Sequence, residues 1–413
     1  MGITTANGWR SKFIFSTIIG MLCSLFATRA GLSICLMLFI AATIVHKNVF
    51  QQLLSFFRSP LLLGMSLLFF IPFISGLWST NVQEWSDVMR IKLPLLFLPI
   101  AFAGNWQLSN KQWRSIAFIF LLILFISTCW SVVQYLQNMA SVHQGYLKAK
   151  VFQTPLQNDH VRYSWLVSVG VLLCLLLLKE ASKKVKIILV ITAIWFAMYL
   201  HILSARTGLG SFYICLFISA IWLLKNGSNK KLVVMAIAVI FCLPILAWLF
   251  LPTFQNRIKY FVYDYSFIKS NTYLPGSNDG NRALSLKAGW SILKENAGGV
   301  GRGDVYAETN KWYTENIPDI QEHDRLYPAS EWLLYGASAG WLGFLLFTAV
   351  MLLPFIFLPV TNQFFWVALN ATAAFSFLFD IGLEVQYGVF LYSFIVLWWW
   401  KWFALKNERV VHE

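Results

Sequence analysis

The sequence predicts an all-α polytopic membrane protein with about twelve transmembrane helices. Of its 413 residues, 58% are apolar, 17% are aromatic and only 12% are charged. A soluble domain usually carries about 25% charged residues, so this composition excludes an ordinary soluble protein. Long apolar runs recur along the whole chain, and the basic residues concentrate in alternate segments between those runs. The three observations together indicate one integral membrane domain over residues 1–413.

Twelve apolar runs account for the predicted spans, and most of them are long enough to cross roughly 30 Å of hydrocarbon as helices. They cover residues 12–28, 31–46, 61–78, 91–104, 114–135, 163–178, 185–203, 208–224, 232–251, 332–358, 363–379 and 385–405. The run at 91–104 is short and contains Pro94 and Pro99, which are expected to kink or interrupt a helix. Without that span, the orientation of every later helix would invert.

The loop charges predict the orientation of the spans, because short cytoplasmic loops collect Lys and Arg. With the N-terminus inside, 16 of the 32 basic residues fall in inside segments and seven in short outside segments. The remaining nine lie in the long loop 252–327, to which the rule does not apply. Both termini are therefore expected in the cytoplasm and 252–327 outside it. The net charge of +14 follows from this topology, and no nucleic-acid partner is expected.

All six cysteines lie inside apolar runs, so neither a disulfide nor a cysteine metal site is expected. Polar chemistry should instead concentrate in 138–162 and in the long loop 252–327. Within that loop, Asn281–Asn296 is predicted to form one amphipathic helix that ends at Gly298. Its expected face consists of Ala283, Leu286, Trp290 and Leu293.

Arg282 lies in the first turn of the predicted helix, where the helix dipole disfavours a cation. It is either an ordinary solvated arginine or one that binds an anionic ligand. The following segment, Gly298–Asp304, lacks the context of a dinucleotide loop or a P-loop. It is predicted to be a flexible turn whose backbone amides are free to approach a lipid or a sugar.

Several cations are predicted to meet at the outer membrane face. Arg206 lies between two spans that are separated by almost no loop, where an unpaired guanidinium is costly to bury. It either has a functional partner or snorkels to anchor the helix end. Arg162 and Arg90 precede or begin spans at the same predicted level. The cluster could anchor headgroups generally, but anionic lipids favour the cytoplasmic leaflet, so a dedicated anionic ligand outside is the sharper hypothesis.

A histidine and a carboxylate lie where the long loop leads into a span. His323 is either a plain loop histidine or a base toward a sugar hydroxyl, and Glu331 is either a helix-start carboxylate or that base. Farther along, Gly336, Gly340 and Gly343 are most simply a close helix-packing face.

These motifs together resemble the O-antigen ligase and O-antigen polymerase superfamily. The resemblance rests on several short sequences, which cover most of residues 80–400. They are Ser-Ala-Arg-Thr-Gly at 204–208, the helix begun by Arg282, Gly-Val-Gly-Arg-Gly at 299–303, Pro-x-Ser-Glu-Trp-Leu at 328–333, Gly-Trp-Leu-Gly at 340–343, Arg90 to Pro99, Asp159 to Ser164, and Glu384-x-Gln386-x-Gly388.

The resemblance implies a GT-C-like, inverting glycosyltransferase of the bacterial inner membrane that uses no cofactor, metal or nucleotide sugar. The implied donor is a glycan on undecaprenyl diphosphate at the periplasmic face, among membrane lipids. Arg206 and Arg282 are the implied diphosphate ligands, with Arg162 and Arg90 as further candidates. Where many relatives carry the histidine proposed as the base, this chain has Ala329. His323 and Glu331 are the expected replacements, or the reaction relies on diphosphate stabilisation.

Three functions remain open at this point. The preferred one is a ligase that transfers a finished glycan to an acceptor such as lipid A-core. A polymerase would instead join two lipid-linked repeat units. A transporter or flippase is the third, although carriers usually place polar groups at the midplane, where these apolar runs are nearly free of charge.

Overall fold

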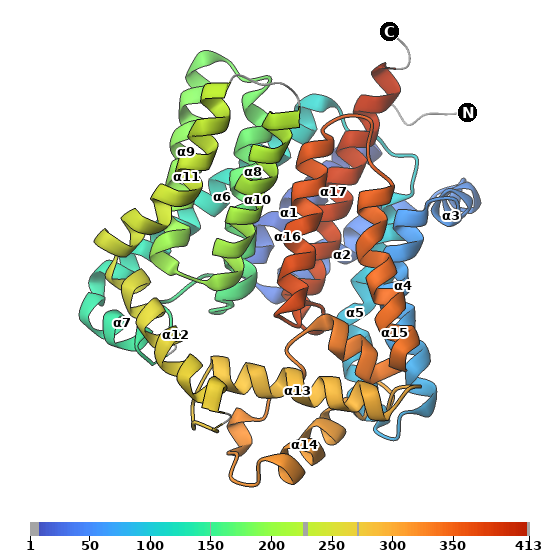
Figure 1. Cartoon of the computed structure of the whole chain (residues 1–413). Helices are drawn as coiled ribbons and strands as arrows, with labels where there is room; N and C mark the ends of the chain where they lie inside the picture. Colours follow the sequence, from blue (N-terminus) through green and yellow to red (C-terminus); the bar gives the residue numbers. More distant parts are fainter. Residues whose placement is uncertain (1–7, 149, 226–229, 271, 411–413) are drawn as a thin grey trace.

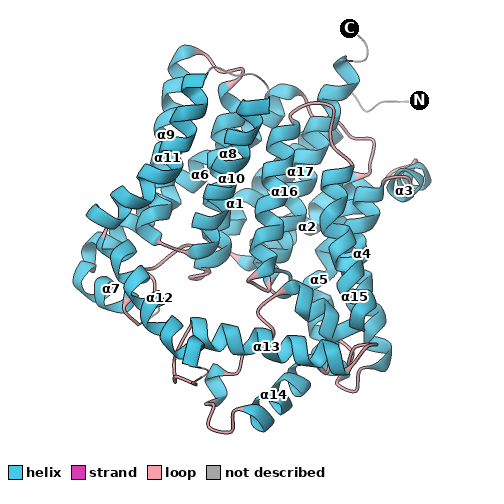
Figure 2. Cartoon of the chain, viewed as in Figure 1, coloured by secondary structure: helices cyan, strands magenta, loops and turns pink. Residues whose placement is uncertain are grey.

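The computed structural model describes residues 8–148, 150–225, 230–270 and 272–410, and these residues form helices without any strand (Figures 1 and 2). Each of the twelve predicted runs coincides with an α-helix. These are α1 (Trp9–Ala27), α2 (Arg29–Ile44), α4 (Pro60–Ser75), α5 (Val82–Phe102), α6 (Asn110–Gln137), α8 (His160–Leu178), α9 (Lys183–Leu203), α10 (Arg206–Lys225), α11 (Lys230–Phe250), α15 (Glu331–Ile356), α16 (Gln363–Leu378) and α17 (Gln386–Val410).

The remaining elements are short or lie in the segments between these helices. They are α3 (Val49–Phe57), α7 (Met139–Tyr146), α12 (Pro252–Ser270), α13 (Asp279–Glu295), α14 (Val305–Asn316) and the 3-10 turns η1 (Gly76–Trp78), η2 (Glu322–Asp324) and η3 (Gly382–Glu384). The predicted polytopic all-α class is confirmed. By length and hydropathy, 8 of the described helices can cross a membrane, or 9 if α2 and α3 form one bent span.

The expected interruption at 91–104 is wrong, because α5 is one continuous helix that begins nine residues before the apolar run. Pro99 has no backbone N–H and leaves the carbonyl of Leu95 without its helical donor. The Ser66 hydroxyl of α4 donates to this carbonyl at 3.3 Å. A neighbouring helix thus replaces the hydrogen bond that the proline removes.

The chain has two distinct ends (Figure 1). α1 begins and α17 finishes at one end, whereas α7, α12, α13 and α14 lie at the other. Residues 1–7 and 411–413, to which the predicted position of the termini refers, lie outside the described residues. Segment 252–327 is mostly helical, and α13 runs across the ends of the bundle helices. We call this the α13 end; its assignment to the outer side of the membrane stays a prediction.

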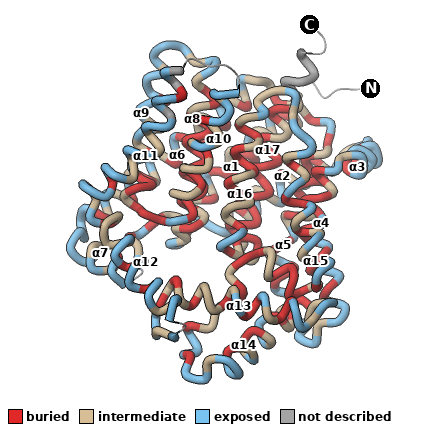
Figure 3. The backbone as a smooth tube through the Cα atoms, viewed as in Figure 1, coloured by how far each residue is buried: buried red, intermediate tan, exposed pale blue. Residues whose placement is uncertain are grey.

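Burial separates core helices from lipid-facing ones (Figure 3). Most side chains of α8 are buried, which places this helix inside the bundle. On α9, Ile187, Ile191 and Ile194 are exposed at helical spacing. Such an apolar row would be unfavourable in water and is expected where a helix faces lipid.

Helix α13 confirms the predicted helix at Asn281–Asn296 within two residues. Of its predicted apolar face, Leu293 is buried and Trp290 is exposed. The buried face also contains small residues because the chain around Pro328 packs closely against it: a Cβ at Gly289 would lie 2.6 Å from that of Pro328. Tertiary packing therefore decides which part of the helix is buried most deeply.

The glycine-rich segment Gly298–Asp304 is a loop held by hydrogen bonds to α15, and we call it the clasp. The predicted flexible turn with free amides is therefore wrong. Its amides are used within the protein: Val300 donates to the Ala337 carbonyl at 2.8 Å and Gly301 to the Ser338 carbonyl at 3.0 Å. The clasp enters a break in α15, where Gly340 has a φ of 66°. A helix-packing face is therefore also the wrong interpretation of Gly340, which contacts a loop.

Gly340→Ala is expected to lower the thermal unfolding temperature of the purified protein by several degrees. Gly340 has φ 66° and ψ −158°, a region that is essentially restricted to glycine, so a side chain there costs about 1–3 kcal/mol. The new Cβ would also collide with the Ala297 carbonyl oxygen. Gly298→Ala is the matched control, because a Cβ at that position meets no atom within 4 Å. Equal unfolding temperatures for the two variants would contradict the clasp.

Candidate functional site

A cavity of about 360 Å³ opens at the α13 end, between α13 and the bundle. Its polar side carries three guanidinium groups from three helices: Arg206 begins α10, Arg257 lies on α12 and Arg282 on α13. Its other side is apolar and includes Phe261 and Phe375. We call this the arginine cavity. It can accept a ligand that has both an anionic group and a hydrocarbon portion.

The three arginines differ in their partners. Arg206 forms an ion pair with Asp279, and Arg282 donates to the Phe379 carbonyl at 3.0 Å. The Nη1 of Arg257 is buried and has no hydrogen-bond partner among the described residues. A buried donor of this kind costs free energy unless a ligand or water satisfies it. Arg257 is therefore poised to bind an anion.

Electrostatics around the arginine cavity also favour an anion. Burial lowers the pKa of Arg257, and the nearby Arg206 lowers it further, while Asp279 opposes this. Burial likewise lowers the pKa of Arg282, an effect that Asp380 opposes and Arg206 reinforces. The cationic forms are thus penalised by desolvation and mutual repulsion, and a bound anion would relieve both penalties.

A second cavity of about 610 Å³ adjoins the first, and both are lined by His160, Val161 and Arg282. It is more polar, so we call it the mixed cavity. Its lining includes Arg162 and Asp380, which form an ion pair at 2.8 Å between Nη2 and Oδ2. Arg162 also contacts Asp159 at 3.3 Å. Burial raises the pKa of Asp380, although Arg162 and Arg282 oppose that shift.

Strained backbone lines part of the mixed cavity. Leu156, Gln157 and Asn158 all have positive φ, at 59°, 58° and 66°. Each non-glycine residue in this region costs about 1–2 kcal/mol, so three in succession need support from the surrounding structure. Such strain tends to cluster at ligand sites, which marks this loop as part of the site.

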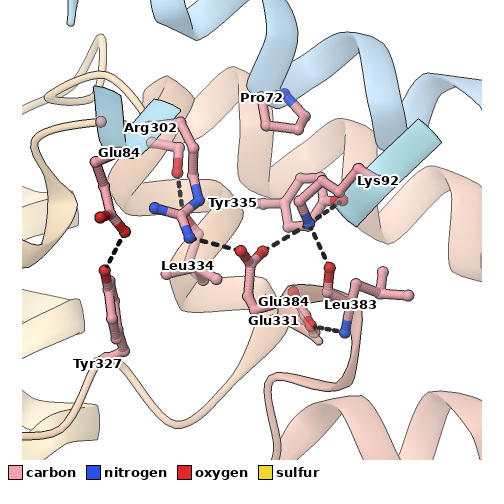
Figure 4. Close-up of polar contacts among 12 residues, drawn as sticks. Pro72, Glu84, Lys92, Arg302, Tyr327, Glu331, Leu334, Tyr335, Leu383 and Glu384 are labelled. Carbon is pink, nitrogen blue, oxygen red and sulfur yellow. Dashed lines mark hydrogen bonds and ion pairs between the residues drawn. The ribbon is translucent and has the colours of Figure 1, made fainter. Parts of the chain in front are cut away.

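Next to these cavities lies a buried ion cluster (Figure 4). Glu384 contacts Lys92 at 2.6 Å and Arg302 at 2.5 Å. Burial alone would raise the pKa of Glu384, but Arg302 and Lys92 outweigh it and hold that pKa below its ordinary value. Because the three residues come from η3, α5 and the glycine-rich segment, the ion cluster fixes these elements to one another.

The structure brings some predicted site residues together and not others. Arg206 and Arg282 line the arginine cavity, and Arg162 lines the mixed cavity. Arg90 lines neither of them; its side chain is 74% exposed and pairs with Asp87 at 3.1 Å. Three of the four predicted arginines therefore line the two adjoining cavities, and Arg90 does not.

The two candidate bases lie outside both cavity linings. His323 is on η2 with its side chain 70% exposed, 3.7 Å from Asp324. Glu331 is fully buried, and its Oε1 accepts a hydrogen bond from the Leu383 amide at 2.5 Å. Ala329 does line the arginine cavity.

Sequence reasoning missed Arg257, Asp380 and His160 as site residues. Asp380 had a visible signal, since it is an acid next to Phe379 at the end of an apolar run. Arg257 had none, because it is one of nine basic residues in a long polar segment. His160 precedes a span like many interfacial residues, and only the fold places it between two cavities.

Comparison with known families matches residues 191–348 to the model described as O-antigen ligase. This match supports the resemblance of the chain to the O-antigen ligase superfamily. The match supports a ligase- or polymerase-type function in general, with a lipid-linked glycan and an acceptor as the general partners. The matched range of the O-antigen ligase family contains Arg206, Arg257, Arg282 and Ala329, whereas Arg162 and Asp380 lie outside it. No curated protein matches the sequence.

Glu384→Gln is expected to destabilise the protein strongly, because it leaves Lys92 and Arg302 buried without their counter-charge. Breaking one partner of a buried ion pair typically costs about 3–5 kcal/mol. Asp87→Asn is the control, since it breaks the exposed pair with Arg90, which is worth about 0–1 kcal/mol. Thermal unfolding in detergent compares the two variants, and similar unfolding temperatures would show that the ion cluster is not structural.

Proposed function

We propose that this protein is a glycosyltransferase that moves a glycan from undecaprenyl diphosphate to an acceptor such as lipid A-core at the periplasmic face of the bacterial inner membrane. One observation carries the proposal: three guanidiniums from the family-matched range line the same cavity as an apolar wall. A polyprenyl diphosphate has these two chemical halves. Its phosphates suit the arginines, and its isoprenoid chain suits the phenylalanine side.

Charge balance supports a diphosphate in the arginine cavity. Three arginines and one aspartate line it, which leaves two net positive charges. A diphosphate diester carries about two negative charges, and guanidinium forks match its oxygens with charge-assisted hydrogen bonds. Arg206 and Arg282 are the expected ligands from sequence, and we add Arg257 because of its unpartnered buried Nη1.

The proposed reaction is a single inverting displacement at the anomeric carbon. An acceptor hydroxyl oxygen forms the new bond to that carbon while the bond to the diphosphate oxygen breaks. The hydroxyl proton passes to a base on the protein, and the electron pair leaves with the diphosphate. Arginines placed where this negative charge grows lower the barrier without a metal.

We assign the proton acceptor to His160. It lines both cavities, so it lies between the proposed donor site and a second polar chamber through which an acceptor glycan can approach. It is in no ion pair among the described residues, whereas Asp279 and Asp380 are each paired with an arginine. Glu331 and His323 stay the alternatives predicted from sequence; neither lines these cavities. Ala329 leaves room in the cavity where relatives carry their histidine.

A lysine at Arg206 or Arg257 is expected to lower transfer roughly 10²–10³-fold, the usual cost of losing a donor to a developing oxyanion. Lysine keeps the charge but loses the bidentate fork. Transfer is measured with purified protein, an undecaprenyl-diphosphate glycan and a core oligosaccharide, and Arg90→Lys is the exposed control. Full activity of both cavity variants would show that the diphosphate does not bind in this cavity.

The same assay distinguishes a ligase from a polymerase through the acceptor that is consumed. In cells, carrier-linked polymer that never reaches the core after gene deletion indicates a ligase. A core that carries a single repeat indicates a polymerase.

His160→Ala is expected to lower turnover about 10²–10⁴-fold while donor binding is retained, because a positioned base contributes that much. The double variant His160→Ala with Ala329→His should regain part of the activity, since both positions line the arginine cavity. His323→Ala should be near normal. Normal turnover of His160→Ala, with a loss confined to Glu331→Gln or His323→Ala, would move the assignment to that residue.

A further inference from the structure

A third cavity lies at the opposite end of the bundle from α13. It has a volume of about 480 Å³ and is bordered by the start of α1, the corner between α2 and α3, the end of α5, and α17. Four cations line it: Arg10, Lys47, Arg58 and Lys401. No Asp or Glu is among its described lining residues. We call it the basic hollow.

Arg10 keeps its positive charge in the basic hollow, because it binds neutral groups. It donates to the carbonyls of Ala42 and Thr43 at 2.9 and 2.8 Å, and these bonds orient the guanidinium but supply no counter-charge. Lys401 donates to the carbonyl of Gly104 at 2.7 Å. Lys47 and Arg58 form no ion pair within the described part of the chain.

The corner that borders the hollow is held in place by side chains. Helix α3 turns 102° from α2 and leaves the bundle sideways (Figure 1). His46 and Gln52 are hydrogen-bonded at 2.7 Å, and Gln52 donates to the Ile100 carbonyl at 2.6 Å. The hollow is therefore formed in advance of any ligand.

Helix α3 also has an apolar, uncovered surface beside the basic hollow. Phe50 is 70% exposed and Phe57 is 63% exposed, and Leu54, between them in the sequence, lines the edge of the hollow. A short helix that leaves the bundle sideways with exposed phenylalanines is typical of a segment lying in the membrane interface. The basic hollow thus lies at the depth of lipid headgroups, next to a surface that suits acyl chains.

We propose that the basic hollow binds the phosphodiester headgroup of an anionic phospholipid, whose acyl chains pack against α3. Basic pockets between membrane helices bind such headgroups on the cytoplasmic side. The general excess of basic residues in inner loops does not by itself make a binding site, because Lys183 and Lys184 are exposed at the same end without lining the hollow. The proposal is independent of the transferase reaction.

Binding is tested on the delipidated full-length protein with phosphatidylglycerol and, separately, phosphatidylcholine, by native mass spectrometry and thermal unfolding. Phosphatidylglycerol should bind and raise the unfolding temperature, and phosphatidylcholine should do so much less. The double variant Lys47→Gln with Arg58→Gln should weaken the binding of phosphatidylglycerol roughly 30-fold, because each cation removed costs about 1 kcal/mol. Lys183→Gln with Lys184→Gln is the matched control and should bind like the wild type.

Three results would overturn the proposal. Equal weakening in both double variants would mean a diffuse surface attraction. Equal binding of both lipids would mean no headgroup selectivity. If inorganic phosphate or glycerol phosphate binds as tightly as the lipid, the ligand of the basic hollow is a free phosphate and not a phospholipid. If the hollow double variant does not fold, Lys47→Gln alone serves, because Lys47 is exposed and only about a fivefold weakening is then expected.

Discussion

The contacts of Glu384 with Lys92 and Arg302 hold together the part of the molecule on which both cavities depend. Taking three charges out of water is costly, and the cost is offset only while each charge keeps its partner. The ion cluster fixes η3 against α5 and the glycine-rich segment. Asp380 lies four residues before Glu384, just ahead of η3, and pairs with Arg162 in the mixed cavity. The geometry of the site thus depends on a buried charge balance behind it.

The two cavities at the α13 end arise where helices begin or finish, and this has a chemical reason. Backbone and charged groups can be satisfied only near the membrane boundary or inside protein, so polar chemistry gathers at helix ends. Arg206 begins α10, His160 begins α8, and Asp380 follows α16. Helix α13 crosses these ends (Figure 1) and contributes Arg282 to the lining of the arginine cavity. A membrane bundle with one covering helix is enough to enclose an anion site beside a polar chamber.

Ala329 lines the arginine cavity but has no titratable side chain, so the proposed chemistry draws its base from another element. His160 approaches the same space from α8. A proton acceptor needs to reach the hydroxyl in space and need not occupy a fixed place in the sequence. The glycine-rich segment is hydrogen-bonded to the break in α15, which is a structural task separate from that of the base.

The sequence by itself determined the helices and the membrane class, because hydropathy over a span is a local property of the chain. It also indicated Arg206 and Arg282, since a cation beside an apolar run or in the first helical turn is conspicuous without any partner. Only the tertiary structure decided that Arg257 joins them, that Arg90 stays outside, and that His160 lies where two cavities meet. These facts depend on contacts between segments far apart in the chain, and no local pattern of polarity records them.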